Sequence, residues 1–86
     1  MGWGMMVDDA VEAVQALQES GYPPTARAVA WLLTGGGCRR PRRSQIDEAR
    51  ATLRLAEEQG RVVEAGAIPT GARPATYYHV VEVAGG

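Results

Sequence analysis

Apolar side chains recur every three or four positions over residues 8–20, which is the spacing of one face of an α-helix. The stripe is formed by Val7, Ala10, Val11, Val14 and Leu17. Acidic residues lie between them, and Asp9 followed by Glu12 is typical of a capping pair at the beginning of a helix. Because Gly21 and the prolines that follow Tyr22 end such a pattern, we predict that the first helix covers residues 8–20.

A second apolar stripe follows the two prolines and predicts a helix over residues 25–34. Thr25 follows the prolines directly, and a threonine hydroxyl readily accepts a free backbone N–H of a first turn. We expect Trp31 to belong to the core, because large apolar side chains at helical spacing are more often core residues than ligand contacts. Three glycines at residues 35–37 end this helix, since successive glycines do not sustain one.

The third helix is predicted over residues 44–59, between an arginine-rich segment and Gly60. Ser44 is expected to cap its first turn, with Asp47 at the third helical position. The side chains on its inward face are Ile46, Ala49, Leu53 and Ala56. Those on its outward face are Asp47, Glu48, Ala51, Arg54, Leu55 and Glu58.

After Gly60 the apolar pattern changes from helical spacing to alternation, which is typical of β-strands. We predict a short strand over residues 61–65 and a longer one over residues 77–83, paired as a hairpin. The segment between them is too long for a two-residue turn and contains Gly66, Pro69, Gly71 and Pro74. Tyr77 and Tyr78 should point to opposite faces, so that one packs on the third helix while the other lies at the surface.

The chain of 86 residues is long enough for one domain with a modest core, and too short for a deep substrate cavity. We expect a flexible amino terminus over residues 1–6, a folded domain over residues 7–83 and a frayed carboxyl terminus over residues 84–86. No stretch approaches the roughly 20 apolar residues of a membrane span, and the first residues lack a signal-peptide pattern. These features favour a cytoplasmic protein that does not enter a membrane.

The reactive side chains form no recognisable catalytic or metal-binding pattern. Cys38 and His79, the single cysteine and the single histidine, supply at most two ligands, fewer than a structural zinc site needs. No serine, cysteine or acidic residue is arranged with His79 as a catalytic triad. We therefore expect neither enzyme activity nor a metal or other cofactor.

The predicted order of elements, three helices and then a two-stranded hairpin, is that of a winged helix–turn–helix domain. The end of the third helix, Leu53-x-x-Ala56-x-x-x-Gly60-x-Val62, resembles the end of that family's recognition helix. The segment Gly71-Ala72-Arg73-Pro74-Ala75-Thr76-Tyr77-Tyr78 resembles the wing of PadR-like transcriptional regulators and of the C-terminal winged helices of phage and plasmid primase-helicase proteins. The resemblance implies a mainly α fold with a small β-hairpin wing. It also implies binding of double-stranded DNA, as part of a transcriptional regulator or a mobile-element replication protein.

Positive charge is gathered in the middle of the chain, although the formal net charge is −1. Residues 1–26 hold four acids and no arginine, residues 27–54 hold seven arginines and two acids, and residues 55–86 hold two arginines and four acids, giving −4, +5 and −2. The densest part is an arginine cluster formed by Arg39, Arg40, Arg42 and Arg43. Such a cluster favours a polyanionic partner, and the alternative is a solvated loop paired with the acidic first helix.

The expected DNA contacts combine the arginine cluster with the third helix and the wing. The expected DNA-binding residues are Arg39, Arg40, Arg42, Arg43, Ser44, Gln45, Arg50, Arg54 and Arg73. The cluster would hold phosphates, while Gln45, Arg50 and Arg54 would face base edges, since glutamine suits adenine and arginine suits guanine. Alternatively, Asp47 pairs with Arg50 or Arg54, and Arg54 pairs with Glu58, as ordinary ion pairs of a helix surface.

A protein-interaction domain is the second function that the sequence leaves open. Ala51 and Leu55 lie on the outward face of the third helix, where a DNA-reading helix carries polar groups. We expect Leu55 to be covered either by the amino terminus or the wing of the same chain, or by a partner chain or a second copy of this chain. Association through this face is therefore the alternative to DNA binding.

Overall fold

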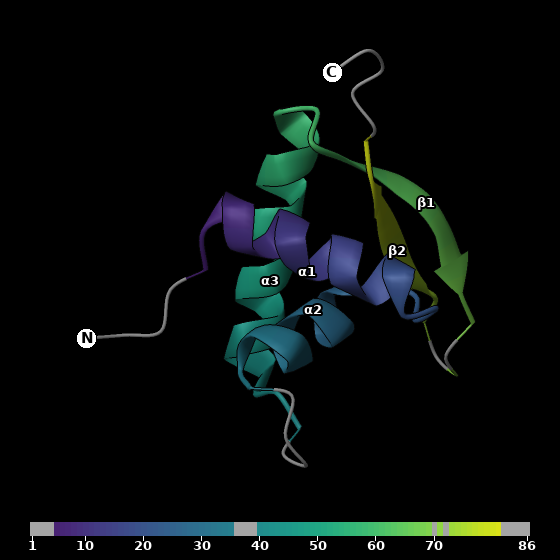
Figure 1. The fold of residues 1–86 in the computed structure, drawn as a ribbon. Helices are drawn as coiled ribbons and strands as arrows, with labels where there is room; N and C mark the ends of the chain where they lie inside the picture. Colours follow the sequence, from purple (N-terminus) through teal and green to yellow (C-terminus); the bar gives the residue numbers. More distant parts are fainter. Residues whose placement is uncertain (1–4, 36–39, 70, 72, 82–86) are drawn as a thin grey trace.

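The computed structural model describes residues 5–35, 40–69, 71 and 73–81, and within them three helices precede an antiparallel hairpin (Figure 1). The elements are α1 (Val7–Glu19), α2 (Ala26–Leu33), α3 (Arg43–Glu58), β1 (Val62–Ile68) and β2 (Ala75–Val80). This arrangement confirms the prediction of a mainly α protein with a small hairpin. The three helices begin and end within about two residues of their predicted bounds.

The first turns of the helices show which capping predictions hold. Thr25 is confirmed as the cap of α2, because its hydroxyl oxygen accepts the backbone N–H of Ala28 at 3.1 Å. The prediction that Ser44 caps α3 with Asp47 is wrong. The helix starts earlier, and Gln45 Oε1 accepts the backbone N–H of Arg42 at 2.8 Å, which places Ser44 inside the first turn.

The predicted pairing of Asp9 with Glu12 at the start of α1 is also wrong. Asp9 Oδ2 instead accepts the backbone N–H of Met6 at 3.4 Å, so Asp9 is the third residue of the helix rather than its cap. The physical reason is common to α1 and α3. A side-chain acceptor three positions into a helix can bind the free backbone N–H that precedes it, which lets the helix begin without a polar cap residue.

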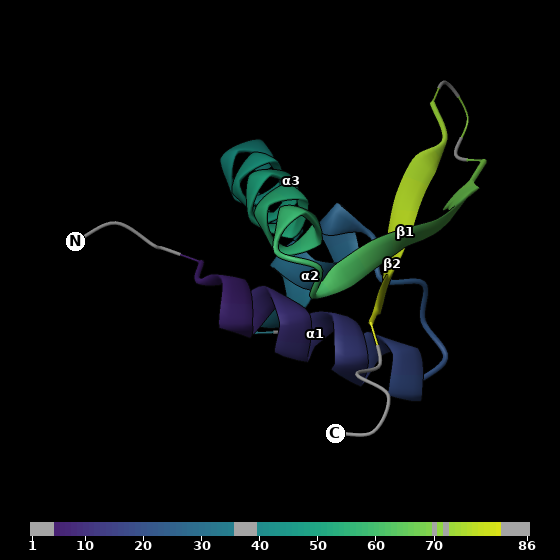
Figure 2. The ribbon, with the colours of Figure 1, turned by 90° about the horizontal axis from the view of Figure 1, so that it is seen from above.

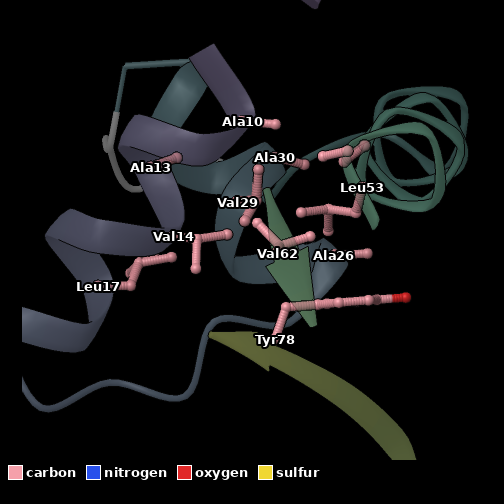
Figure 3. Close-up of a cluster of buried hydrophobic side chains, with 12 residues drawn as sticks. Ala10, Ala13, Val14, Leu17, Ala26, Val29, Ala30, Leu53, Val62 and Tyr78 are labelled. Carbon is pink, nitrogen blue, oxygen red and sulfur yellow. The ribbon is translucent and has the colours of Figure 1, made fainter. Parts of the chain in front are cut away.

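One core joins the three helices to the hairpin (Figure 3). Its buried apolar residues are Ala10, Ala13, Val14, Leu17, Ala26, Val29, Ala30, Ala49, Leu53, Ala56, Val62 and Tyr78. Half of them are alanines, all on helices, and small side chains let the helices approach closely. Larger side chains fill the centre, among which Leu53, Val14 and Val29 are fully buried. The predicted inward face of α3 is confirmed by burial of Ala49, Leu53 and Ala56.

Trp31 lies outside this core, so the prediction that it is a core residue is wrong. Its side chain is 39% exposed, whereas Val29 and Ala30 beside it are fully buried. Successive residues of a helix are turned by about 100°, and the three buried positions of α2 leave Trp31 at the edge of the buried face. Apolar spacing alone does not fix how far a short helix is rotated about its axis.

The hairpin is longer than predicted, because both strands extend toward the turn. Val62 pairs with Val80, Glu64 with Tyr78 and Gly66 with Tyr77, so Ala65 has no partner and forms a bulge. The predicted strand of residues 61–65 ended at this irregularity, while β1 continues to Ile68. β2 correspondingly begins at Ala75 rather than at residue 77, and residues 82 and 83 lie outside the described part.

The ring of Tyr77 lies against Gly66 at the bulge, where a side chain would displace it. A Cβ atom at Gly66 would lie 2.6 Å from the hydroxyl oxygen of Tyr77 and 2.8 Å from the ring carbon that carries it. Both distances are well below van der Waals contact. The bulge therefore brings the Tyr77 ring against the backbone of β1, and leaves Tyr78 on the opposite face.

Three contacts fix the hairpin against the helices. The backbone N–H of Tyr78 donates to the Pro24 carbonyl at 3.0 Å, and that of Val80 donates to Gln18 Oε1 at 2.7 Å. Arg61, at the beginning of the hairpin, forms an ion pair with Asp8 of α1. Figure 2 shows the result, with β2 beside the end of α1 and the hairpin rising next to α3.

Candidate nucleic-acid interface

An open groove of about 910 Å³ lies between α3, the start of α2 and the hairpin. Its walls include Ile46, Arg50 and Arg54 of α3, Arg27 of α2, Glu64 and Ile68 of β1, Tyr78 of β2, and Arg73. The groove exists because the contact of β2 with Pro24 holds the hairpin beside α2 without closing it against the first half of α3.

The described walls of the groove carry an excess of positive charge. Four arginines line it, namely Arg27, Arg50, Arg54 and Arg73, against the single carboxylate of Glu64, which gives +3 from four minus one. All five side chains are exposed. A groove with an excess of positive charge attracts a polyanion more strongly than the net charge of −1 suggests, because the potential depends on where the charges lie.

Arg50 and Arg54 occupy the same side of α3, since residues four positions apart are neighbours on a helix surface. Arg50 Nη1 lies 3.4 Å from Asp47 Oδ1, which confirms the predicted pairing of these two residues. The side chains are 58% and 56% exposed, so the pair is weak and Arg50 can exchange it for a phosphate. In the described part of the chain Arg54 forms no ion pair, and the predicted alternative of an Arg54–Glu58 bridge is wrong.

Three members of the arginine cluster lie at the start of α3 or just before it. Arg40, Arg42 and Arg43 are exposed, and within the described ranges none of them pairs with an acid of α1. The alternative interpretation, in which the cluster pairs with acids of the first helix, therefore has no supporting contact among the described residues. Asp8 of α1 forms its ion pair with Arg61. Arg39 and Cys38 lie outside the described residues.

Ser44 and Gln45 differ in their availability to a ligand. Ser44 is exposed in the first turn of α3. Gln45 is half-buried, and its carbonyl oxygen already accepts the backbone N–H of Arg42. Recognition of an adenine needs both ends of the glutamine amide, so Gln45 would have to give up this bond to read a base.

None of the acidic side chains of α3 is among the residues that line the groove. Glu48, predicted to point outward, is half-buried and accepts the backbone N–H of Met5 at 2.7 Å, so this prediction is wrong. The segment before α1 crosses α3 at this point, and Met5 packs against the core. None of the described groove-lining residues belongs to α1, which carries the acidic residues of the amino-terminal part.

The Ala51/Leu55 face lies on a different side of α3 from the groove. Leu55 is 45% exposed and Ala51 is also exposed. Leu55 follows Arg50 by five positions, which turns it by about 140° around the helix axis. Neither the hairpin nor Met5 and Met6 cover Leu55 fully, so a partner could still contact it.

Two groove residues, Arg27 and Tyr78, were not predicted as site residues from the sequence. Arg27 is in the first turn of α2, and in the sequence only its position after the Thr25 cap could have indicated that it belongs to the site. Tyr78 is buried in the core, as predicted for one of the two tyrosines, and it also lines the groove. In Figure 3 its phenol oxygen lies at the end of the ring that points away from Val14 and Val62. His79 is exposed, and its ring lies 5.7 Å from that of Tyr77.

No protein-family model, curated protein or solved structure matches this chain. Among the described helices, none has the length and apolar character required to cross a bilayer. The described residues also contain no group of three histidine, cysteine or acidic side chains placed to hold a metal ion.

Proposed function

We propose that this chain is a winged helix domain that binds double-stranded DNA, with α3 as the recognition helix and β1–β2 as the wing. The observation that carries the proposal is the groove between α3 and the hairpin, lined by Arg27, Arg50, Arg54 and Arg73. Arginine is well suited to this task, because its planar guanidinium binds phosphates and guanine edges through paired hydrogen bonds.

The dimensions of α3 agree with this role. Sixteen residues make a helix about 24 Å long, and its width of roughly 10–12 Å fits the major groove of B-DNA. Arg50 and Arg54 would then face the DNA from the exposed side of the helix. Arg40, Arg42 and Arg43, together with the free N–H groups of the first turn, would hold the phosphates of one strand.

The hairpin and the start of α2 would contact the backbone on either side of α3. Arg73 lies between β1 and β2, where the fold brings it to the same groove as Arg27. The wing motif is the basis for placing the domain in a transcriptional regulator or a mobile-element replication protein. Both are cytoplasmic roles in which the domain works on duplex DNA.

Removal of Arg50 and Arg54 tests the groove directly. We expect the Arg50→Ala/Arg54→Ala variant to bind a labelled mixed-sequence duplex more weakly, with the slope of log K against log salt flattened by about 0.9 for each phosphate that is no longer neutralised. Fluorescence anisotropy over a salt series measures both quantities. The control is Arg61→Ala, which removes one positive charge from a residue outside the groove that is bound to Asp8, and it should leave the salt slope unchanged. Wild-type protein that fails to bind duplex at low salt would refute the function.

A protein-interaction domain is the second candidate, favoured by the 45% exposure of Leu55 on α3. We expect Leu55→Glu to change the free energy of unfolding by less than about 0.5 kcal/mol, since the side chain is at the surface. A thermal melt measures stability, and sedimentation measures association. A stable wild-type dimer that Leu55→Glu splits without unfolding would establish association through this face, whereas a monomeric wild type would exclude self-association.

A further inference from the structure

We infer that the hydroxyl of Tyr78 is an uncharged phosphate donor in the floor of the groove, an inference that rests on the proposed DNA binding. The inference is based on the position of the Tyr78 side chain, which belongs to both the core and the groove wall. The ring of Tyr78 belongs to the core and the residue is only 7% exposed, yet it also lines the groove.

Two backbone contacts of Tyr78 fix the position from which its ring extends. The Tyr78 N–H donates to the Pro24 carbonyl at 3.0 Å, and Tyr78 faces Glu64 across the hairpin. In Figure 3 the phenol oxygen points away from the apolar cluster formed by Val14, Val62 and their neighbours. A rigid donor of this kind loses little conformational freedom when it binds a ligand.

The hydroxyl is free to bind an external group. No group of the described chain forms a hydrogen bond with it, and no described side-chain polar atom is both fully buried and unpartnered. The oxygen therefore reaches the solvent that fills the groove. Buried side chains usually use their polar atoms in hydrogen bonds within the protein. The Tyr78 hydroxyl has no such bond, so it is available to a ligand in the groove.

The four arginines that line the groove outnumber its one carboxylate, Glu64, and favour a phosphate oxygen as the acceptor. Arg50 and Arg54 line the groove together with Tyr78 and would hold an anion there. Burial, with Glu64 and Glu57 adding to it, raises the pKa of Tyr78 above its usual value of about 10, so the phenol keeps its proton at neutral pH. Tyrosine hydroxyls commonly donate to phosphates in DNA complexes.

The test is the Tyr78→Phe variant, with Tyr77→Phe as a matched control. Tyr77 is the neighbouring residue on the opposite face of β2 and lies outside the groove walls. We expect Tyr78→Phe to lower affinity for a mixed-sequence duplex by about three- to tenfold, the loss of one hydrogen bond. The salt slope should stay unchanged, because a neutral donor releases no counterion. Tyr77→Phe should bind as the wild type does.

A duplex in which single phosphates are replaced by neutral methylphosphonates identifies the acceptor. At one position the replacement should abolish the difference between wild type and Tyr78→Phe. Equal affinity of the two proteins on the natural duplex would overturn the inference while leaving the proposed function intact. A Tyr78→Phe variant that unfolds in a thermal melt, or whose weaker binding depends on base sequence and on no phosphate, would overturn it too. Wild-type protein without duplex binding would instead refute the proposed function itself.

Discussion

Replacing Arg39, Arg40, Arg42 and Arg43 with alanine should weaken binding to every duplex sequence by a similar factor. The reason is that, in the proposed complex, the arginine cluster would contact phosphates, which carry no sequence information. The slope of log K against log salt should flatten by about 0.9 for each phosphate that is no longer neutralised, and several such phosphates correspond to orders of magnitude in affinity at low salt. Titration of two unrelated duplexes at several salt concentrations measures the effect.

Replacing the same four arginines with lysine provides the control. Lysine keeps the charge but lacks the planar fork of the guanidinium, so the salt slope should be close to that of the wild type. An alanine variant with an unchanged slope would contradict phosphate binding by the cluster. An alanine variant that discriminates between the two duplexes would instead indicate that these side chains read bases.

Leu53→Ala should destabilise the fold by about 2–5 kcal/mol, the usual cost of a cavity at a buried leucine. Leu53 is fully buried where α3 meets the rest of the core. Small domains are stable by only about 5–15 kcal/mol, so this loss is a large part of the total free energy of unfolding. In a domain of this size each kcal/mol lowers the melting temperature by about 4–8 °C. A denaturant titration followed by circular dichroism measures the change.

Leu55→Ala is the matched control for this core prediction, because it makes the same substitution two positions along the same helix. Leu55 is 45% exposed, and its replacement should change the free energy of unfolding by less than about 0.5 kcal/mol. Equal destabilisation by both variants would mean that Leu55 is covered in solution. In that case the face of α3 that carries Leu55 is not free for a partner.

Much of the fold followed from local sequence signals. Apolar spacing located all three helices, and the change of period after Gly60 located the hairpin, because these signals depend on neighbours a few residues apart. Local signals were less accurate at the ends of elements. Ser44 is a good cap residue in isolation, but the side chain of Gln45 binds the free N–H of Arg42 and α3 starts earlier.

The hairpin shows how a bulge conceals a strand from sequence analysis. Alternation of apolar and polar positions stops at Ala65, where one residue of β1 has no partner, and the prediction ended there. The strand continues because Gly66, Ala67 and Ile68 pair with residues 75–77 of β2, which are contacts between different strands. Such contacts depend on the register between the two strands, and the sequence of a single strand does not specify that register.

By itself the sequence determined three helices, a hairpin and a positively charged middle, since all of these depend on composition and on spacing along the chain. Only the tertiary structure decided that Arg27, Arg50, Arg54 and Arg73 line one groove together with Tyr78. It likewise left Leu55 exposed on another side of α3. The physical reason is that these placements depend on the rotation of α2 and α3 about their axes and on the register of the hairpin. Both are set by packing between residues distant in the chain.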